Sequence, residues 1–201
     1  MFAFLAGVAA GLLHVFSGPD HLAAVAPLAS DRARGQWLTG LQWGVGHTMG
    51  VLLIAALLLL LKEQLPLDAI SAYSERVVGA SLIMIGGWGL RRAWVLRRSM
   101  GEMHSHTHMG ASFAMGTMHG LAGSSHLFGV LPALAFSSRA ASIVYLAGFG
   151  IGAVAGMTAF SAALGLAHRR LGRRNPRSYG GLLYASSAIA LVVGGVWLVG
   201  Q

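Results

Sequence analysis

The sequence predicts an all-α polytopic membrane protein of six transmembrane helices. Of its 201 residues, 55% are hydrophobic and only 10% are charged, whereas a soluble domain carries charge on about a quarter of its positions. Several apolar stretches also approach the roughly 20 residues that span a bilayer core. The formal net charge of +8 comes mostly from arginines between these stretches, which argues against nucleic acid as a partner.

The expected helices are separated by short polar connections. They cover residues 2–29, 35–61, 74–96, 111–136, 140–168 and 179–199. The first stretch lacks the basic start and the cleavage site of a signal peptide, so we interpret it as a transmembrane helix. Eleven of the 14 basic residues lie in or beside the first, third and fifth connections. The positive-inside rule then predicts a multi-pass protein of the bacterial inner membrane with both termini outside.

An internal repeat relates residues 11–28 to residues 116–133 at an offset of 105. The matched residues are Gly11, His14, Gly18, His21, Leu22, Val25 and Pro27 with Gly116, His119, Gly123, His126, Leu127, Val130 and Pro132. After one residue of slippage, Gly44, Gly46 and Gly50 match Gly150, Gly152 and Gly156. Because each half has three helices, the second half is expected to be inverted relative to the first. We therefore predict repeats at 1–96 and 111–201, joined by a histidine-rich cytoplasmic loop at 97–110.

Ionisable residues interrupt the apolar first helix. His14, Asp20 and His21 flank Ser17-Gly18-Pro19, where the glycine and the proline are expected to break the helix, as in the matching helix of the second repeat. Such groups are costly inside a membrane, which favours a functional role. The predicted metal ligands are His14, Asp20, His21, His47, His119 and His126, and the first four are expected to matter more than the last two. Because cysteine is absent, nitrogen and oxygen donors favour a borderline divalent ion over copper(I).

A second histidine cluster lies in the predicted loop. His104, His106 and His108 alternate with other residues between Met103 and Met109, a pattern typical of weak metal binding. We interpret them as an accessory site for ion capture, with a solvated linker as the alternative. Structural hydrogen bonding between helices is likewise the alternative for each membrane histidine.

The segments HVFSGPDH and GHT resemble the nickel/cobalt transporter (NiCoT/NicO) superfamily. The segment HGLAGSSH after a histidine-rich loop is similar to the small urease-accessory-type membrane proteins of that superfamily. The resemblance implies metal-binding roles for His14, Asp20 and His21, and for the motif of Gly46 and His47. Five residues, not four, separate His14 from Asp20, and the two additional helices of larger members are missing.

The predicted function is secondary transport of a divalent transition metal ion, nickel or cobalt first, through a midplane site of histidine and aspartate. An enzyme and a permanent cofactor are not expected, since the ion is the cargo. The expected partners are the ion and the lipid bilayer, while a homo-oligomer and a cytoplasmic metallochaperone stay open. The alternatives are an intramembrane hydrolase that uses a metal or a serine such as Ser124 or Ser125, and a metal-sensing membrane partner without transport.

Overall fold

The computed structural model describes residues 1–201 apart from 31–34, 62–66, 99–108, 123–124, 175–176 and 200–201. The described residues form eight helices and no strand, which confirms the predicted all-helical class. The helices are α1 (Phe2–Ser17), α2 (Pro19–Ser30), α3 (Gln36–Leu61), α4 (Leu67–Arg98), α5 (Met109–Leu121), α6 (Ser125–Leu134), α7 (Arg139–Arg174) and α8 (Arg177–Val199).

The structure has more helices than the six expected because two of the expected helices are each divided. The stretch 2–29 becomes α1 and α2, whose axes are bent by 73°. Gly18 between them has φ −88° and ψ 100°, an extended conformation, and Pro19 begins α2, where a proline needs no backbone N–H partner. The stretch 111–136 likewise becomes α5 and α6.

Three described helices are long and apolar enough to cross a membrane. They contain the spans Gln36–Leu57 in α3, Arg139–Ala167 in α7 and Gly180–Val199 in α8, and the bent pair of α1 and α2 makes a fourth if it counts as one span. The apolar part of α4, 77–90, is bounded by Arg76 and Arg91, while α5 and α6 have 13 and 10 residues. Length and composition therefore identify a membrane protein, but they do not by themselves identify six spans.

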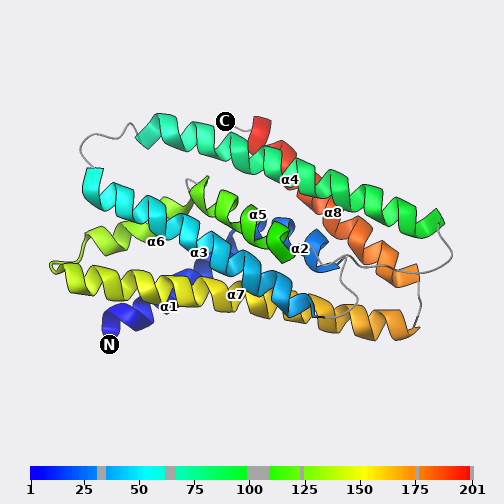
Figure 1. The fold of residues 1–201 in the computed structure, drawn as a ribbon, viewed down its shortest axis with the longest axis horizontal. Helices are drawn as coiled ribbons and strands as arrows, with labels where there is room; N and C mark the ends of the chain where they lie inside the picture. The colour runs from blue at the N-terminus through cyan, green and yellow to red at the C-terminus, as the bar shows by residue number, and fades with distance from the viewer. Residues whose placement is uncertain (31–34, 62–66, 99–108, 123–124, 175–176, 200–201) are drawn as a thin grey trace.

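The helices pack in pairs that connect the two halves of the chain. Helix α1 packs along α7, α5 along α3, α4 along α8, and α3 along α7. Figure 1 shows α2 and α5 in the middle of the bundle, with α4 and α8 on one side of them and α7 on the other. In the internal repeat, α5 is the counterpart of α1 and α3 is the counterpart of α7. The α1–α7 pair and the α5–α3 pair are therefore equivalent.

Glycines let the backbones approach closely at the two equivalent seams. A Cβ on Gly11 of α1 or Gly152 of α7 would collide with a backbone carbonyl of the facing helix, and the same holds for Gly116 of α5 and Gly46 of α3. These four are two of the pairs that the internal repeat matches. Small residues at such contacts are typical of helix packing in membranes, where backbones touch directly.

The short helix α2 is surrounded by the rest of the bundle. It contacts α3, α4, α7 and α8, and its apolar residues Ala23, Ala24, Val25 and Ala29 are at most 3% exposed. This packing holds the first turn of α2, and therefore Asp20 and His21, in the interior.

Candidate metal site

Four histidines and one aspartate meet at the break between α1 and α2. His14 comes from α1, Asp20 and His21 from the first turn of α2, His47 from the middle of α3 and His119 from the last turn of α5. Asp20, His21, His47 and His119 are at most 2% exposed, and His14 is partly exposed. The structure therefore brings together five of the six predicted ligands.

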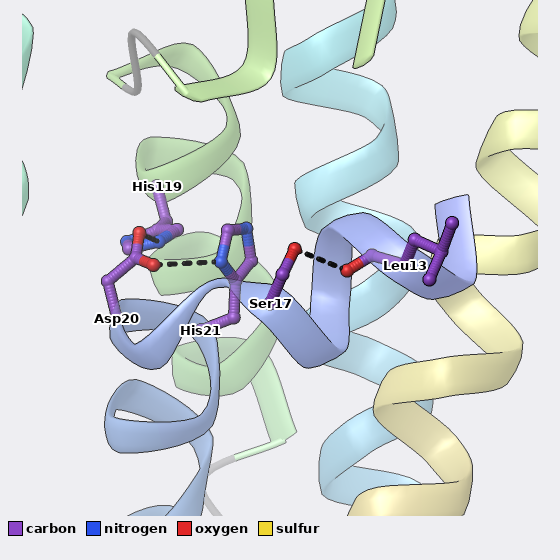
Figure 2. Close-up of polar contacts among 5 residues, drawn as sticks. All are labelled: Leu13, Ser17, Asp20, His21 and His119. Carbon is purple, nitrogen blue, oxygen red and sulfur yellow. Dashed lines mark hydrogen bonds and ion pairs between the residues drawn. The ribbon is translucent and has the colours of Figure 1, made fainter. Parts of the chain in front are cut away.

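The break itself positions the side chains of Asp20 and His21. A Cβ on Gly18 would lie 2.9 Å from Asp20 Oδ1 and would collide with His21 Nδ1, so glycine leaves the space that these groups occupy. On the α1 side, Ser17 Oγ donates a hydrogen bond to the carbonyl of Leu13 at 2.5 Å (Figure 2). On the α2 side, Asp20 lies in the first turn, where the helix dipole favours a negative charge.

Asp20 links the two halves of the chain. His21 Nδ1 lies 3.1 Å from Asp20 Oδ1, and His119 Nε2 lies 3.1 Å from Asp20 Oδ2. Figure 2 shows the carboxylate between the two imidazoles. An ionised carboxylate only accepts hydrogen bonds, so both ring nitrogens donate. This geometry fixes which nitrogen of each ring carries the proton while Asp20 is ionised.

The imidazole rings lie close enough together for several of them to bind one ion. The ring centroids of His14 and His21 are 4.5 Å apart, those of His21 and His47 are 4.9 Å apart, and those of His21 and His119 are 5.0 Å apart. The rings of His14 and His47 stack at 5.6 Å. His21 is thus the central ring of the cluster.

The donor atoms form two sets that could each hold a metal ion. One set is His14, His21 and His47, the other is Asp20, His21 and His119, and within each set the donor atoms lie within 4.8 Å of one another. Zinc-like ions bind nitrogen and oxygen at about 2.0–2.2 Å, so two ligands of one ion are at most about 4.4 Å apart. Small side-chain movements are therefore enough to close either set around an ion.

Two aromatic side chains form walls of the cluster. Trp43 of α3 lies 5.7 Å from the ring of His119, and Phe149 of α7 lies 5.4 Å from the ring of His14, both measured between centroids. Both are fully buried. Trp43 thus belongs to the core of the bundle. Phe149 was not singled out, because nothing in its local sequence separates it from other apolar residues of α7.

Several predicted residues cannot be placed in the site. His104, His106, His108 and Ser124 lie outside the described residues, and the side chains of His126 and Ser125 are also outside them although both belong to α6. The accessory loop site, the sixth ligand and the serine alternative therefore stay predictions.

Three known proteins are similar to this chain. It is 39% identical over 207 residues to Chloroplast protein FOR GROWTH AND FERTILITY 2 of Arabidopsis thaliana, a match that covers 97% of the chain and 55% of that protein. It is 34% identical over 206 residues to Chloroplast protein FOR GROWTH AND FERTILITY 1 of the same plant, covering 94% and 56%. The third is Urease accessory protein UreH of Bacillus sp. (strain TB-90), 27% identical over 206 residues, covering 94% of the chain and 86% of that protein.

The chain thus spans a little more than half the length of the two plant proteins. No protein-family model and no solved structure matches it. The expected relation to urease accessory membrane proteins is confirmed at the level of distant homology.

Proposed function

We propose that this protein is a secondary transporter that carries a divalent transition metal ion, Ni²⁺ or Co²⁺ first, through the cluster of histidines and Asp20. The observation that carries the proposal is that four imidazoles, three of them buried, meet a buried carboxylate at one helix break. Groups of this kind are expensive in a bilayer and mark ion pathways. Broken helices are also where many transporters bind their cargo.

The donor chemistry supports the choice of ion. Imidazole suits nickel, zinc, copper and iron, whereas Mg²⁺ and Ca²⁺ prefer shells of oxygen ligands, and the absence of cysteine weakens the case for copper(I). Distant homology to a urease accessory protein supports nickel or cobalt within this group. The ion is the cargo, so the proposal includes neither a permanent cofactor nor an enzymatic reaction.

The proposed architecture is six spans in two inverted repeats of three. It is supported by the repeated order of a divided helix followed by two long helices, by the matching seams between α1 and α7 and between α5 and α3, and by the matched glycines at those seams. The connections rich in arginine would be cytoplasmic and the termini outside. A bacterial inner membrane remains the proposed location, although two relatives are named as chloroplast proteins.

The loop histidines have an accessory role in this proposal. His104, His106 and His108 would raise the local concentration of the ion, or accept it from a metallochaperone, on the cytoplasmic side. Their contribution should be largest at low metal concentration, because a weak site adds little once the transport site is saturated.

The test is uptake of radioactive nickel and cobalt into proteoliposomes. We expect uptake by the native protein, none by the His14→Ala/His21→Ala variant, and reduced uptake only at low metal concentration when the three loop histidines are alanine. If the native protein shows no flux in either direction and the loop variant no longer binds the ion, the proposed function would change from transport to metal sensing. Correct insertion is checked by protease protection of each reconstituted variant.

A further inference from the structure

The two donor sets share one residue but differ in their other ligands. His21 belongs both to the set with His14 and His47 and to the set with Asp20 and His119. The first set offers three nitrogens and includes the partly exposed His14, whereas the second offers two nitrogens and an oxygen and is buried throughout. The sets therefore differ in donor type and in access.

The hydrogen bonds of Asp20 decide which set is available in the observed arrangement. His21 Nδ1 donates to Asp20 Oδ1 over 3.1 Å, and a nitrogen that carries a proton cannot bind a metal ion. His21 then offers its other nitrogen, Nε2, to an ion shared with His14 and His47. Asp20 in this arrangement is not a ligand but the carboxylate that orients a ligating imidazole, a common role in metal sites.

A different arrangement makes Asp20 a ligand. If each ring carries its proton on the other nitrogen, His21 on Nε2 and His119 on Nδ1, then His21 Nδ1, His119 Nε2 and one carboxylate oxygen of Asp20 can surround an ion. No proton is gained or lost by either ring. The contacts of 3.1 Å lie within the spacing of neighbouring ligands around an ion, which is about 3.0–3.4 Å at bond lengths near 2.1 Å.

We propose that the cluster holds its ion at either of two adjacent positions that share His21. The outer position consists of His14, His21 and His47, with Asp20 as the orienting carboxylate. The inner position consists of Asp20, His21 and His119. The two positions use opposite nitrogens of His21, so an ion leaves Nε2, His14 and His47 before it binds Nδ1, Asp20 and His119.

The order of the positions follows from their exposure. His14 is the one partly exposed ligand among the five, so an ion that enters from its side meets the outer position first. The inner position joins α2 of the first half to α5 of the second. Occupying it therefore connects the two halves through the ion itself.

The proposal rests on the metal chemistry of the proposed function but not on flux, so it can be tested on purified protein at equilibrium. Co²⁺ is the probe, because its visible absorption spectrum depends on the number and type of its ligands. Bound metal is counted by elemental analysis after dialysis. The variants are His14→Gln, which removes the outer position, His119→Gln, which removes the inner one, and His21→Gln, which removes both.

We expect the His14→Gln and His119→Gln variants each to retain one Co²⁺ with about 10- to 100-fold weaker affinity and with different spectra. The His21→Gln variant should bind none under the same conditions. Identical spectra for the first two variants, or loss of binding in both as complete as in His21→Gln, would show one composite position and overturn the proposal. Glutamine keeps each side chain polar, and a Gly87→Ala protein, altered where an added Cβ meets nothing within 4 Å, controls for handling.

Unfolded variants are recognised by a shifted elution volume and an early thermal transition. In that case His47→Gln is measured for the outer position. Asp20→Asn is measured for the inner one, and it also removes the carboxylate that orients His21 in the outer position. Two distinct spectra without flux in the native protein would contradict the transport function and leave this proposal standing. Flux with a single spectrum would do the reverse.

Discussion

Replacing Gly120 by alanine should weaken metal binding although residue 120 carries no ligand. Gly120 follows His119 in α5, and a Cβ there would collide with the carbonyl oxygen of His47 on α3 and lie 3.0 and 3.1 Å from its carbonyl carbon and Cα. Carbon atoms pack at about 3.5–4.0 Å. Because the atoms in the way are backbone, they cannot rotate aside as a side chain could.

The size of the effect can be worked out from these distances. The added methyl group forces α5 and α3 apart by roughly 1 Å, and this moves His119 relative to His47. Metal ligands must lie within about 0.2 Å of their ideal distances, so we expect Co²⁺ affinity to fall by at least about 10-fold. Overpacking of this kind also costs about 1–3 kcal/mol of folding stability.

The assay combines equilibrium dialysis with Co²⁺ and thermal unfolding in one detergent. Gly87→Ala is the matched control, since an added Cβ at Gly87 of α4 meets nothing within 4 Å. Alanine is favoured over glycine in a helix by about 1 kcal/mol, so the control should unfold at the same or a higher temperature and bind Co²⁺ normally. Unchanged affinity in Gly120→Ala would refute the idea that the α3–α5 seam sets the geometry of the site.

Four further substitutions probe the site and its support. Asp20→Asn keeps the side-chain size but leaves one oxygen to accept from two rings, so Co²⁺ affinity should fall about 10- to 100-fold in dialysis; full affinity would exclude any role for the carboxylate. Gly18→Ala adds a Cβ where the side chains of Asp20 and His21 lie, so nickel uptake into proteoliposomes should be lost, and normal uptake would show that the break tolerates crowding. Ser142→Ala and Tyr145→Phe each remove a hydrogen bond to a carbonyl of α6, of 2.6 and 3.0 Å. Each should lower stability by about 1 kcal/mol in thermal unfolding and leave Co²⁺ affinity unchanged, whereas the opposite pattern would mean that α6 shapes the site.

Much of the fold follows from local sequence. The apolar stretches predict the helices, and Gly18 with Pro19 predicts the break between α1 and α2 because a proline removes a backbone donor. Helix ends were less predictable. Helix α4 was expected over 74–96 and covers Leu67–Arg98, and α7 was expected over 140–168 and covers Arg139–Arg174. Arginine is a good helix former, so a polar sequence beyond the apolar core does not end a helix.

The site was predictable in its residues more than in its contacts. A regular helix would place His14 and His21 about 10 Å apart, and the break reduces the distance between their ring centroids to 4.5 Å. The sequence ranked His119 below the histidines of the first half, yet the structure places it as close to Asp20 as His21 is. That contact depends on how α5 packs along α3, which no local pattern encodes.

The bond between Asp20 and His119 also bears on how the protein is made. The two residues are 99 positions apart in the chain, and at about 5–20 residues per second a ribosome needs roughly 5–20 s to synthesise the segment between them. During that interval Asp20 has His21 but not His119 beside it. Because a carboxylate is costly in a bilayer, we expect α2 to remain near the insertion machinery until α5 has been inserted. The centre of the cluster is thus completed late in synthesis, when the second half of the chain reaches the first.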